Sequence, residues 1–342
     1  MKGLLVSSPR TFELVEKEIP KLQDNQVLVK IKYAGVCGSD GHIWHKGMSK
    51  YVIGHEICGF IEDPGNSEFK KGDKVCLSEL SSCFQCEFCK SGRDHLCNAV
   101  SSDGPGLSRD GGYAEFVPVR ADMVRKVPDD LPLELAALTE PVAVALHGIN
   151  RLQIPPGETL LVWGNGPIGA YAAFCAKQLG VKKVYMVGRG QRRVDLCNEF
   201  DFVDECFSVK DPDFEKKILN VSPEGGFGYV VDALGSNKDF NRIIGYMKKD
   251  GNLVLQGMQD TDVIFRTISL LVKEINVYPG ILFTIKEFED ALAMINKGKK
   301  ELQKTITSII PLDVDSVQNM FVKMFDSGEN DDYKVLIDPE LT

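Results

Sequence analysis

Four cysteines lie close together in the first third of the chain, in the run CFQCEFCKSGRDHLC. Their spacing, C-x2-C-x2-C-x7-C, is typical of a closed tetrahedral zinc site with four thiolate ligands. A disulfide cluster is the alternative, but a chain of 342 residues needs no such cross-links, and no secretory signal is expected at its beginning. The sequence therefore predicts a structural zinc site at Cys83, Cys86, Cys89 and Cys97.

The composition narrows the class of protein further. The net charge is −9, which argues against binding to nucleic acid or to an anionic membrane surface. No stretch of eighteen apolar residues occurs, so no transmembrane helix is expected. Five other cysteines lack ligand spacing and are expected to be buried, reduced thiols: Cys58, Cys76, Cys175, Cys197 and Cys206. We expect a soluble, cytoplasmic protein with two domains.

The pattern of predicted strands and helices divides the chain into three parts, with boundaries at residues 148 and 282. Residues 1–148 contain many short strand-like runs punctuated by Gly, Pro and Asp, which predicts a mainly β domain whose loops hold the cysteine lobe at 83–97. Residues 149–282 alternate strands and helices, as a doubly wound parallel sheet does. Residues 283–342 are too few for a separate domain and are expected to return to the first one.

A glycine-rich turn opens the second domain. The run Gly164-Asn165-Gly166-Pro167-Ile168-Gly169 matches GxGxxG, follows an apolar strand and precedes an apolar helix. That context gives an otherwise weak pattern its meaning, because the free N–H groups at the helix start can face a pyrophosphate. The sequence predicts a dinucleotide-binding turn formed by these six residues.

The next strand predicts which dinucleotide is preferred. An acid at its end would bind the ribose hydroxyls of NAD. The strand instead ends in Gly188-Arg189, and two further arginines, Arg192 and Arg193, follow. Arginine pairs well with a 2′-phosphate, so NADP(H) is favoured over NAD(H), with Gly188 and Arg189 in the cofactor site.

A second set of possible metal ligands is scattered along the chain. Cys37 begins the run CGSDGH, His55 and Glu56 lie in GHE, and Glu140 lies in TEP. Cysteine, histidine and glutamate together suit an open, catalytic zinc site. Each motif alone would carry little weight, because spacing does not link them.

Taken together, the motifs resemble those of the zinc-containing medium-chain dehydrogenase/reductase family, the alcohol and polyol dehydrogenases. The order CGSDGH, GHE, GDKV, four-cysteine loop, GGYAEF, TEP and GNGPIG is kept over nearly the whole chain. The resemblance implies an α/β protein with a GroES-like, mainly β catalytic domain and a Rossmann domain. The glutamate followed by proline at 140–141 is more like the sorbitol dehydrogenase branch than the classical alcohol dehydrogenases.

The resemblance also implies roles for individual residues. Cys37 and His55 would bind the catalytic zinc, and Glu140 would be the third ligand, either directly or through a water molecule. Glu56 would enter the metal's coordination shell transiently. Ser39 would contact the substrate oxygen, and His42 would pass the proton to solvent, or would be a plain surface histidine. Asp40 would orient His55.

The predicted activity is reversible hydride transfer between a secondary alcohol, sugar alcohol or polyol (phosphate) and NADP(H) or NAD(H), with two zinc ions per chain. The alternatives are a zinc-independent quinone or enoyl reductase and a non-catalytic zinc-binding protein on the same fold. The resemblance implies a homodimer or homotetramer, and the apolar run 274–283 is the candidate contact.

Overall fold

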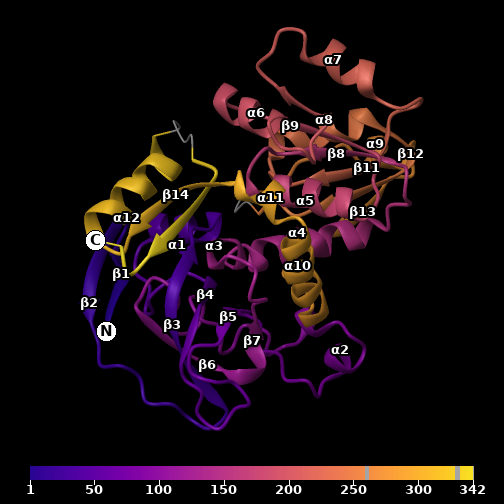
Figure 1. The fold of residues 1–342 in the computed structure, drawn as a ribbon. Coiled ribbons are helices and arrows are strands. Elements are labelled where there is room, and N and C mark those ends of the chain that lie inside the picture. The colour runs from indigo at the N-terminus through magenta and orange to yellow at the C-terminus, as the bar shows by residue number, and fades with distance from the viewer. Residues whose placement is uncertain (259–261, 328–331, 342) are drawn as a thin grey trace. The chain divides into compact units, whose positions relative to one another are not determined.

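The structure is a computed structural model, and it describes residues 1–258, 262–327 and 332–341. The chain forms two compact units, which are described separately (Figure 1). Unit 1 contains residues 1–140 and 284–342, and unit 2 contains residues 141–283. The sequence had placed these boundaries at 148 and 282. The long helix α4 (Thr139–Leu152) carries the chain from one unit into the other.

Unit 1 is built on a seven-stranded sheet, counted over the described residues, in the order β14-β15-β3-β4-β5-β7 with β6 paired to β3. The longest strand, β3, has ten residues, contains Val, Leu and Ile, and is mostly buried, which suits a central position. The strands are β3 (Gln26–Gly35), β4 (Glu56–Asp63), β5 (Lys74–Leu77), β6 (Phe116–Arg120), β7 (Val124–Lys126), β14 (Ile306–Pro311) and β15 (Lys334–Asp338).

The end of the chain completes this sheet. β15 pairs antiparallel with β3 and parallel with β14, so residues from both ends of the sequence share one core. A separate hairpin is formed by β1 (Lys2–Ser8) and β2 (Thr11–Glu16). The helical segments are α1 (Gly38–Lys46), α2 (Glu87–Lys90), η1 (Asp94–Leu96), η2 (Ala121–Met123), α3 (Leu133–Ala136), α10 (Ile285–Lys297), α11 (Lys299–Gln303), α12 (Val314–Phe321) and η3 (Val322–Asp326).

Unit 2 is a parallel sheet of six strands, among the residues described, in the order β10-β9-β8-β11-β12-β13. The order reverses direction between β8 and β11, as in the Rossmann fold, where ligands bind at this switch point. The strands are β8 (Thr159–Trp163), β9 (Lys183–Gly188), β10 (Glu205–Ser208), β11 (Phe227–Asp232), β12 (Met247–Leu255) and β13 (Asn276–Pro279).

Helices connect these parallel strands, because a parallel pair cannot be joined by a tight hairpin. Figure 1 shows them beside the sheet of unit 2. Their apolar faces pack on a core that includes Trp163, Phe214 and Phe227. The connecting helices are α5 (Pro167–Gln178), α6 (Gln191–Asn198), α7 (Phe214–Val221), α8 (Asn237–Tyr246) and α9 (Thr267–Leu271). The predicted fold class, a mainly β domain with a Rossmann-type sheet, is confirmed.

Candidate active site and metal centres

Two neighbouring strands of unit 1 bring the first candidate ligands together. β3 ends at Gly35, two residues before Cys37, and β4 begins at Glu56, directly after His55. Gly35 and Glu56 are register partners in the antiparallel pair. A Cβ built on Gly35 would lie 1.9 Å from Glu56 Oε2, so only glycine lets the glutamate fold back over the strand here.

The resulting cluster has the composition of an open metal site. One ligand atom each from Cys37, His55 and Glu56 lies within 4.8 Å of the others. His55 and Glu56 are buried, at 6% and 1% exposure. A thiolate, an imidazole and a carboxylate are the ligand types that zinc accepts. Glu140, in the first turn of α4, is buried and interacts electrostatically with all three, but it lies outside this close group.

Asp40 lies next to His55 and also accepts hydrogen bonds from Cys37 and Tyr113. Its Oδ2 accepts hydrogen bonds from Cys37 N at 2.9 Å and from Tyr113 Oη at 2.8 Å. Its Oδ1 lies 3.7 Å from His55 Nδ1. Nδ1 therefore faces the carboxylate, which leaves the other ring nitrogen for a metal, the arrangement that fixes a ligand histidine's orientation.

The electrostatics of the cluster favour a bound cation. Burial raises the pKa of Glu140 well above its usual value, and neighbouring Glu79 raises it further. Burial alone would lower the pKa of His55, but Cys37, Asp40 and Glu140 together raise it well above its usual value. The site thus concentrates negative charge in a buried place, which a divalent cation would neutralise.

Several buried polar atoms here have no hydrogen-bond partner among the described residues. They include Ser39 Oγ, Asp40 Oδ1, His55 Nδ1, Glu56 Oε1 and Glu79 Oε2. Buried polar groups are normally paired, so unpaired ones at one place indicate a missing ligand or water. The residues present therefore fit a zinc ion and a substrate oxygen. His42, three residues after Ser39 on α1, is exposed.

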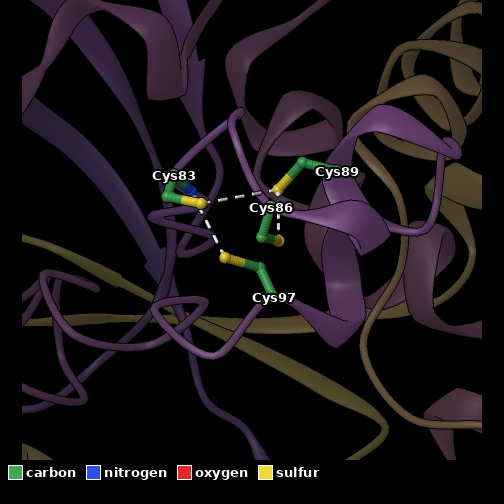
Figure 2. A group of neighbouring side chains, drawn as sticks. All are labelled: Cys83, Cys86, Cys89 and Cys97. Atoms are coloured by element: carbon green, nitrogen blue, oxygen red, sulfur yellow. Dashed lines mark hydrogen bonds between the residues drawn. The ribbon is translucent and has the colours of Figure 1, made fainter.

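The four cysteines predicted as a structural site also converge (Figure 2). The Sγ atoms of Cys86 and Cys89 are 3.5 Å apart, and those of Cys83 and Cys89 are 4.0 Å apart. A tetrahedron with zinc–sulfur bonds of 2.3 Å requires about 3.8 Å between sulfurs. All four are free thiols in the structure, and their ligand atoms lie within 4.8 Å of one another.

The acidity of these thiols depends on their neighbours. Backbone N–H groups, first that of Gln85, lower the pKa of Cys83 to about 6. Burial and then the adjacent thiols of Cys86 and Cys97 raise the pKa of Cys89 to about 12. Four thiolates this close repel one another unless a cation lies between them, so the lobe fits zinc.

In unit 2 the glycine-rich turn lies between β8 and α5. Gly164 has a φ of +123°, a backbone conformation that residues other than glycine rarely adopt. Gly166 caps α5, Pro167 is the first helical residue, and Ile168 and Gly169 follow within the helix. Space is open around Gly166, where a Cβ would meet nothing within 4 Å. The start of a twelve-residue helix beside open space fits a pyrophosphate.

A cavity of about 210 Å³ adjoins this turn. Gly188 and Arg189 lie at the end of β9, and Asn165 donates an amide hydrogen bond to Arg189 O at 3.2 Å. The sequence-predicted cofactor residues Gly164, Asn165, Gly166, Gly188 and Arg189 all line the cavity. So does Arg193, whereas Pro167, Ile168 and Gly169 lie in α5.

Comparison with known proteins agrees with this geometry. Residues 23–129 match the alcohol dehydrogenase GroES-like domain, and residues 167–297 match the zinc-binding dehydrogenase domain. L-galactonate-5-dehydrogenase of Escherichia coli is 30% identical over 320 residues, 91% of this chain and 92% of that protein. The chain belongs to the zinc-containing medium-chain dehydrogenase/reductase family.

Other members of the family are similar over comparable lengths. D-arabinitol dehydrogenase 1 of Uromyces fabae is 29% identical over 323 residues, 92% of this dehydrogenase and 91% of the relative. The crystal structure of galactitol-1-phosphate dehydrogenase from Escherichia coli superposes with a TM-score of 0.88 at 26% identity, over 99% of this chain and 100% of that one. Over residues 1–258, 262–327 and 332–341, no helix of this dehydrogenase is long and apolar enough to cross a membrane.

Two charged residues at the dehydrogenase's candidate active site were not predicted from the sequence. Lys334, on β15, forms an ion pair with Glu56, and both side chains are almost fully buried. Glu79, two residues after β5, is 1% exposed and interacts electrostatically with Glu140, whose pKa it raises. Glu79 carries a signal that was available, since an acid next to apolar residues before the cysteine lobe is unusual. No local sequence signal could have predicted the role of Lys334, because its partner Glu56 is 278 positions away in the chain.

Three histidines and one tyrosine were given no role by the sequence, and the structure shows where they lie. His45 Nε2 lies 2.8 Å from Asp326 Oδ1, on the π-helical segment η3. His95 and His147 are buried. None of these three was predicted to be a ligand. Tyr113, from the GGYAEF motif, was also given no role by the sequence, and the structure places its hydroxyl on Asp40.

Proposed function

We propose that this chain is a zinc-dependent polyol dehydrogenase that reversibly converts a secondary hydroxyl of a sugar alcohol, polyol or polyol phosphate into a ketone, with NADP(H) or NAD(H) as the hydride carrier. One observation carries the proposal. In a chain of this family, Cys37, His55 and Glu56 place ligand atoms within 4.8 Å of one another beside unpaired buried polar atoms. This is the donor set of an open zinc site.

Cys37 and His55 would hold the catalytic zinc, with Glu140 as a third ligand, directly or through water, and Glu56 as a transient one. The bound zinc supplies Lewis acidity to the substrate oxygen, and the nicotinamide accepts or returns the hydride. Asp40 holds His55 in the ligating orientation. A second zinc would lie in the lobe of Cys83, Cys86, Cys89 and Cys97 and stabilise that lobe without contacting substrate.

A proton must leave the buried site when the alcohol is oxidised. Ser39 Oγ is buried and has no hydrogen-bond partner in the part of the chain that the structure describes, so it can bond to the substrate hydroxyl. His42 lies on the same helix and is exposed, so its imidazole can exchange a proton with water. We assign Ser39 to the substrate contact and His42 to the release of the proton.

The cofactor would bind on the glycine turn of unit 2, and we propose NADP(H) as the preferred one. Gly188 stands where an acid would bind the ribose hydroxyls of NAD. Arg189 and Arg193 line the adjoining cavity and carry the charge that a 2′-phosphate needs. The substrate class is proposed from the relatives, whose names specify D-arabinitol, L-galactonate and galactitol 1-phosphate.

Two other functions fit the same fold less well. A zinc-independent quinone or enoyl reductase would have no use for the Cys37–His55–Glu56 cluster. A non-catalytic zinc-binding protein would need neither the cofactor cavity nor the unpaired Ser39 hydroxyl.

We also propose a cytoplasmic homodimer or homotetramer. Strand β13 is at the edge of the sheet of unit 2, and exposed apolar side chains surround it in sequence, including Ile268, Leu271, Val272 and Ile281. Such a face is commonly covered by another chain.

The test is a substrate and cofactor panel. The purified protein is assayed for oxidation of D-arabinitol, galactitol 1-phosphate and L-galactonate, and for reduction of ketoses, quinones and enones, with NADPH and NADH. The proposal predicts turnover of a polyol or ketose, greater with NADPH, and loss of that turnover after zinc chelation. Reduction of quinones or enones that survives chelation, with no polyol oxidised, would favour the reductase instead.

A further inference from the structure

Asp239 is a buried acid in the cofactor cavity to which the proposed function gives no role. It lies in the first turn of α8 and is 7% exposed. It lines the same cavity as Gly164, Gly188 and Arg189, and it is the one carboxylate among the described residues that line it. The loop that leads to α8 is held by Asp232, whose Oδ1 accepts from Leu234 N and Gly235 N at 3.0 and 2.9 Å.

Asp239 forms an ion pair with the arginine that is proposed to bind the cofactor. Arg189 Nη2 lies 3.3 Å from Asp239 Oδ2. The arginine side chain is 59% exposed and that of the aspartate only 10%, so the arginine is the partner that a ligand can reach from solvent. A half-exposed pair of this kind is weak, and a phosphate can compete for the arginine.

Position 188, at the end of β9, has no room for an acid. A Cβ built on Gly188 would lie 1.9 Å from Asn165 Cγ, so the asparagine fills the space that a side chain would occupy. Asn165 Oδ1 in turn accepts from Arg189 N at 3.3 Å, which fixes the turn. The carboxylate of this pocket thus comes from α8, across the cavity from the strand that normally provides it.

We propose that Asp239 determines how strongly this enzyme discriminates between NADP(H) and NAD(H). A 2′-phosphate carries a charge of about −1.5 to −2. The negative charge of Asp239 would repel such a phosphate when it binds to Arg189. The same carboxylate can accept a hydrogen bond from a ribose hydroxyl of NAD(H). Asp239 therefore weakens NADP(H), supports NAD(H) and keeps both cofactors usable. This inference rests on the proposed dinucleotide site.

The experiment measures cofactor affinity and not only activity. Dissociation constants of NADPH and NADH are determined by nicotinamide fluorescence for the full-length protein, for Asp239→Asn and for Asp195→Asn. Asp195 is an exposed acid on α6 that does not line the cavity, so its loss removes the same charge without touching the pocket. Asp239→Asn should tighten NADPH about tenfold and weaken NADH a few-fold, as expected for one nearby charge. Asp195→Asn should leave both affinities within about twofold.

The outcomes separate this inference from the proposed function. If the parent protein binds neither NADPH nor NADH, the proposed dinucleotide site is wrong. If it binds them but Asp239→Asn changes both affinities equally, or neither, Asp239 does not discriminate. Arg189→Gln gives an independent check should Asp239→Asn unfold: it should weaken NADPH at least tenfold and NADH less than threefold. An equal effect of Arg189→Gln on both cofactors would overturn the inference as well.

Discussion

Glu56 and Lys334 form an ion pair that is removed from solvent, with side chains 1% and 2% exposed. Lys334 Nζ also donates to Val36 O at 3.1 Å. Burying a charge costs several kcal/mol unless a partner compensates it. The lysine therefore compensates the Glu56 carboxylate beside Cys37 and His55, where that carboxylate can take part in metal binding.

Replacing Lys334 by Met should be strongly destabilising, by about 3–5 kcal/mol, because it leaves the Glu56 charge buried without a partner. The matched control is Lys30→Met, which removes a surface pair with Glu340 whose side chains are 43% and 44% exposed, and which should cost less than about 1 kcal/mol. Urea unfolding measures both. The double variant Lys334→Met/Glu56→Gln should recover part of the loss, and equal effects of the two lysine variants would refute the account.

This pair illustrates what the sequence could and could not predict at the site. Cys37, His55 and Glu140 were proposed because their motifs occur together in a recognised order. Lys334 was missed because an ion pair between distant positions leaves no local pattern. Its place follows only from the register that sets β15 against β3.

A second ion-pair cluster, in unit 2, should make stability depend on pH. Asp204 is paired with Lys177 and Lys183, each at 2.6 Å, and accepts from Val184 N at 2.8 Å. Burial alone would raise the pKa of Asp204, but these partners lower it overall. Its stabilisation is therefore fully present above the unfolded pKa of about 3.9 and is lost as the pH falls through the lower folded value.

Asp204→Asn should thus reduce the free energy of unfolding at pH 7 by about 1 kcal/mol. The difference from the parent protein should shrink as the pH falls below the unfolded pKa of about 3.9 and through the lower folded value. Thermal unfolding at a series of pH values measures it, with Glu224→Gln, an exposed acid of the same unit, as the control. A difference that persists unchanged at low pH would mean that the effect is not due to the charge.

At the scale of elements, the cysteine lobe is tied to helix α10. The helix is capped by Thr284, whose side chain accepts from Glu287 N at 3.1 Å, while Glu287 Oε2 accepts from Thr284 N at 2.8 Å. The next N–H, of Ile285, donates to Asp94 Oδ2 at 2.9 Å. Asp94 belongs to the lobe, so the zinc proposed for the lobe would be coupled to the helix start through this hydrogen bond.

Loss of the lobe's zinc, in Cys97→Ser, should therefore loosen the first turn of α10. Losing one capping hydrogen bond costs about 1 kcal/mol, which corresponds to about fivefold faster exchange. Hydrogen exchange at residues 285–288 measures this. Helix α12 is the internal control, because its own residue Asp313 caps it through Ser316 N at 2.8 Å. Unchanged exchange in α10, or an equal increase in α12, would contradict the coupling.

Elements also differ in how readily the sequence predicts them. The apolar strand, glycine turn and apolar helix around Gly164 follow one another directly in the sequence, and this unit was predicted. Helix α1 was not, because it contains Gly38 and Gly41 and has little amphipathic pattern. It is stabilised instead by Asp40, which accepts from Cys37 N, so the residue that orients His55 also starts the helix.

For the whole molecule, the exposed apolar residues near β13 predict assembly. Leu271 is 69% exposed on this face. Leu271→Glu should place a charge in the contact and weaken the oligomer at least tenfold. Light scattering after size exclusion should then give a mass near the 37.8 kDa of one chain. Leu219→Glu, on α7 and 61% exposed, is the control and should leave the parent mass unchanged. A monomeric parent protein would refute the proposed contact.

The central claim is that one zinc, held by Cys37 and His55, serves the chemistry while a second stabilises the cysteine lobe. The most direct test measures zinc content and ketose reduction in the parent protein and in Cys37→Ser. The control variant is Cys175→Ala, which removes a buried thiol of α5. The account predicts two zinc ions per chain in the parent and control, one in Cys37→Ser, and no turnover in Cys37→Ser with circular dichroism unchanged. A fully active Cys37→Ser enzyme, or a parent protein with one zinc or none, would contradict it.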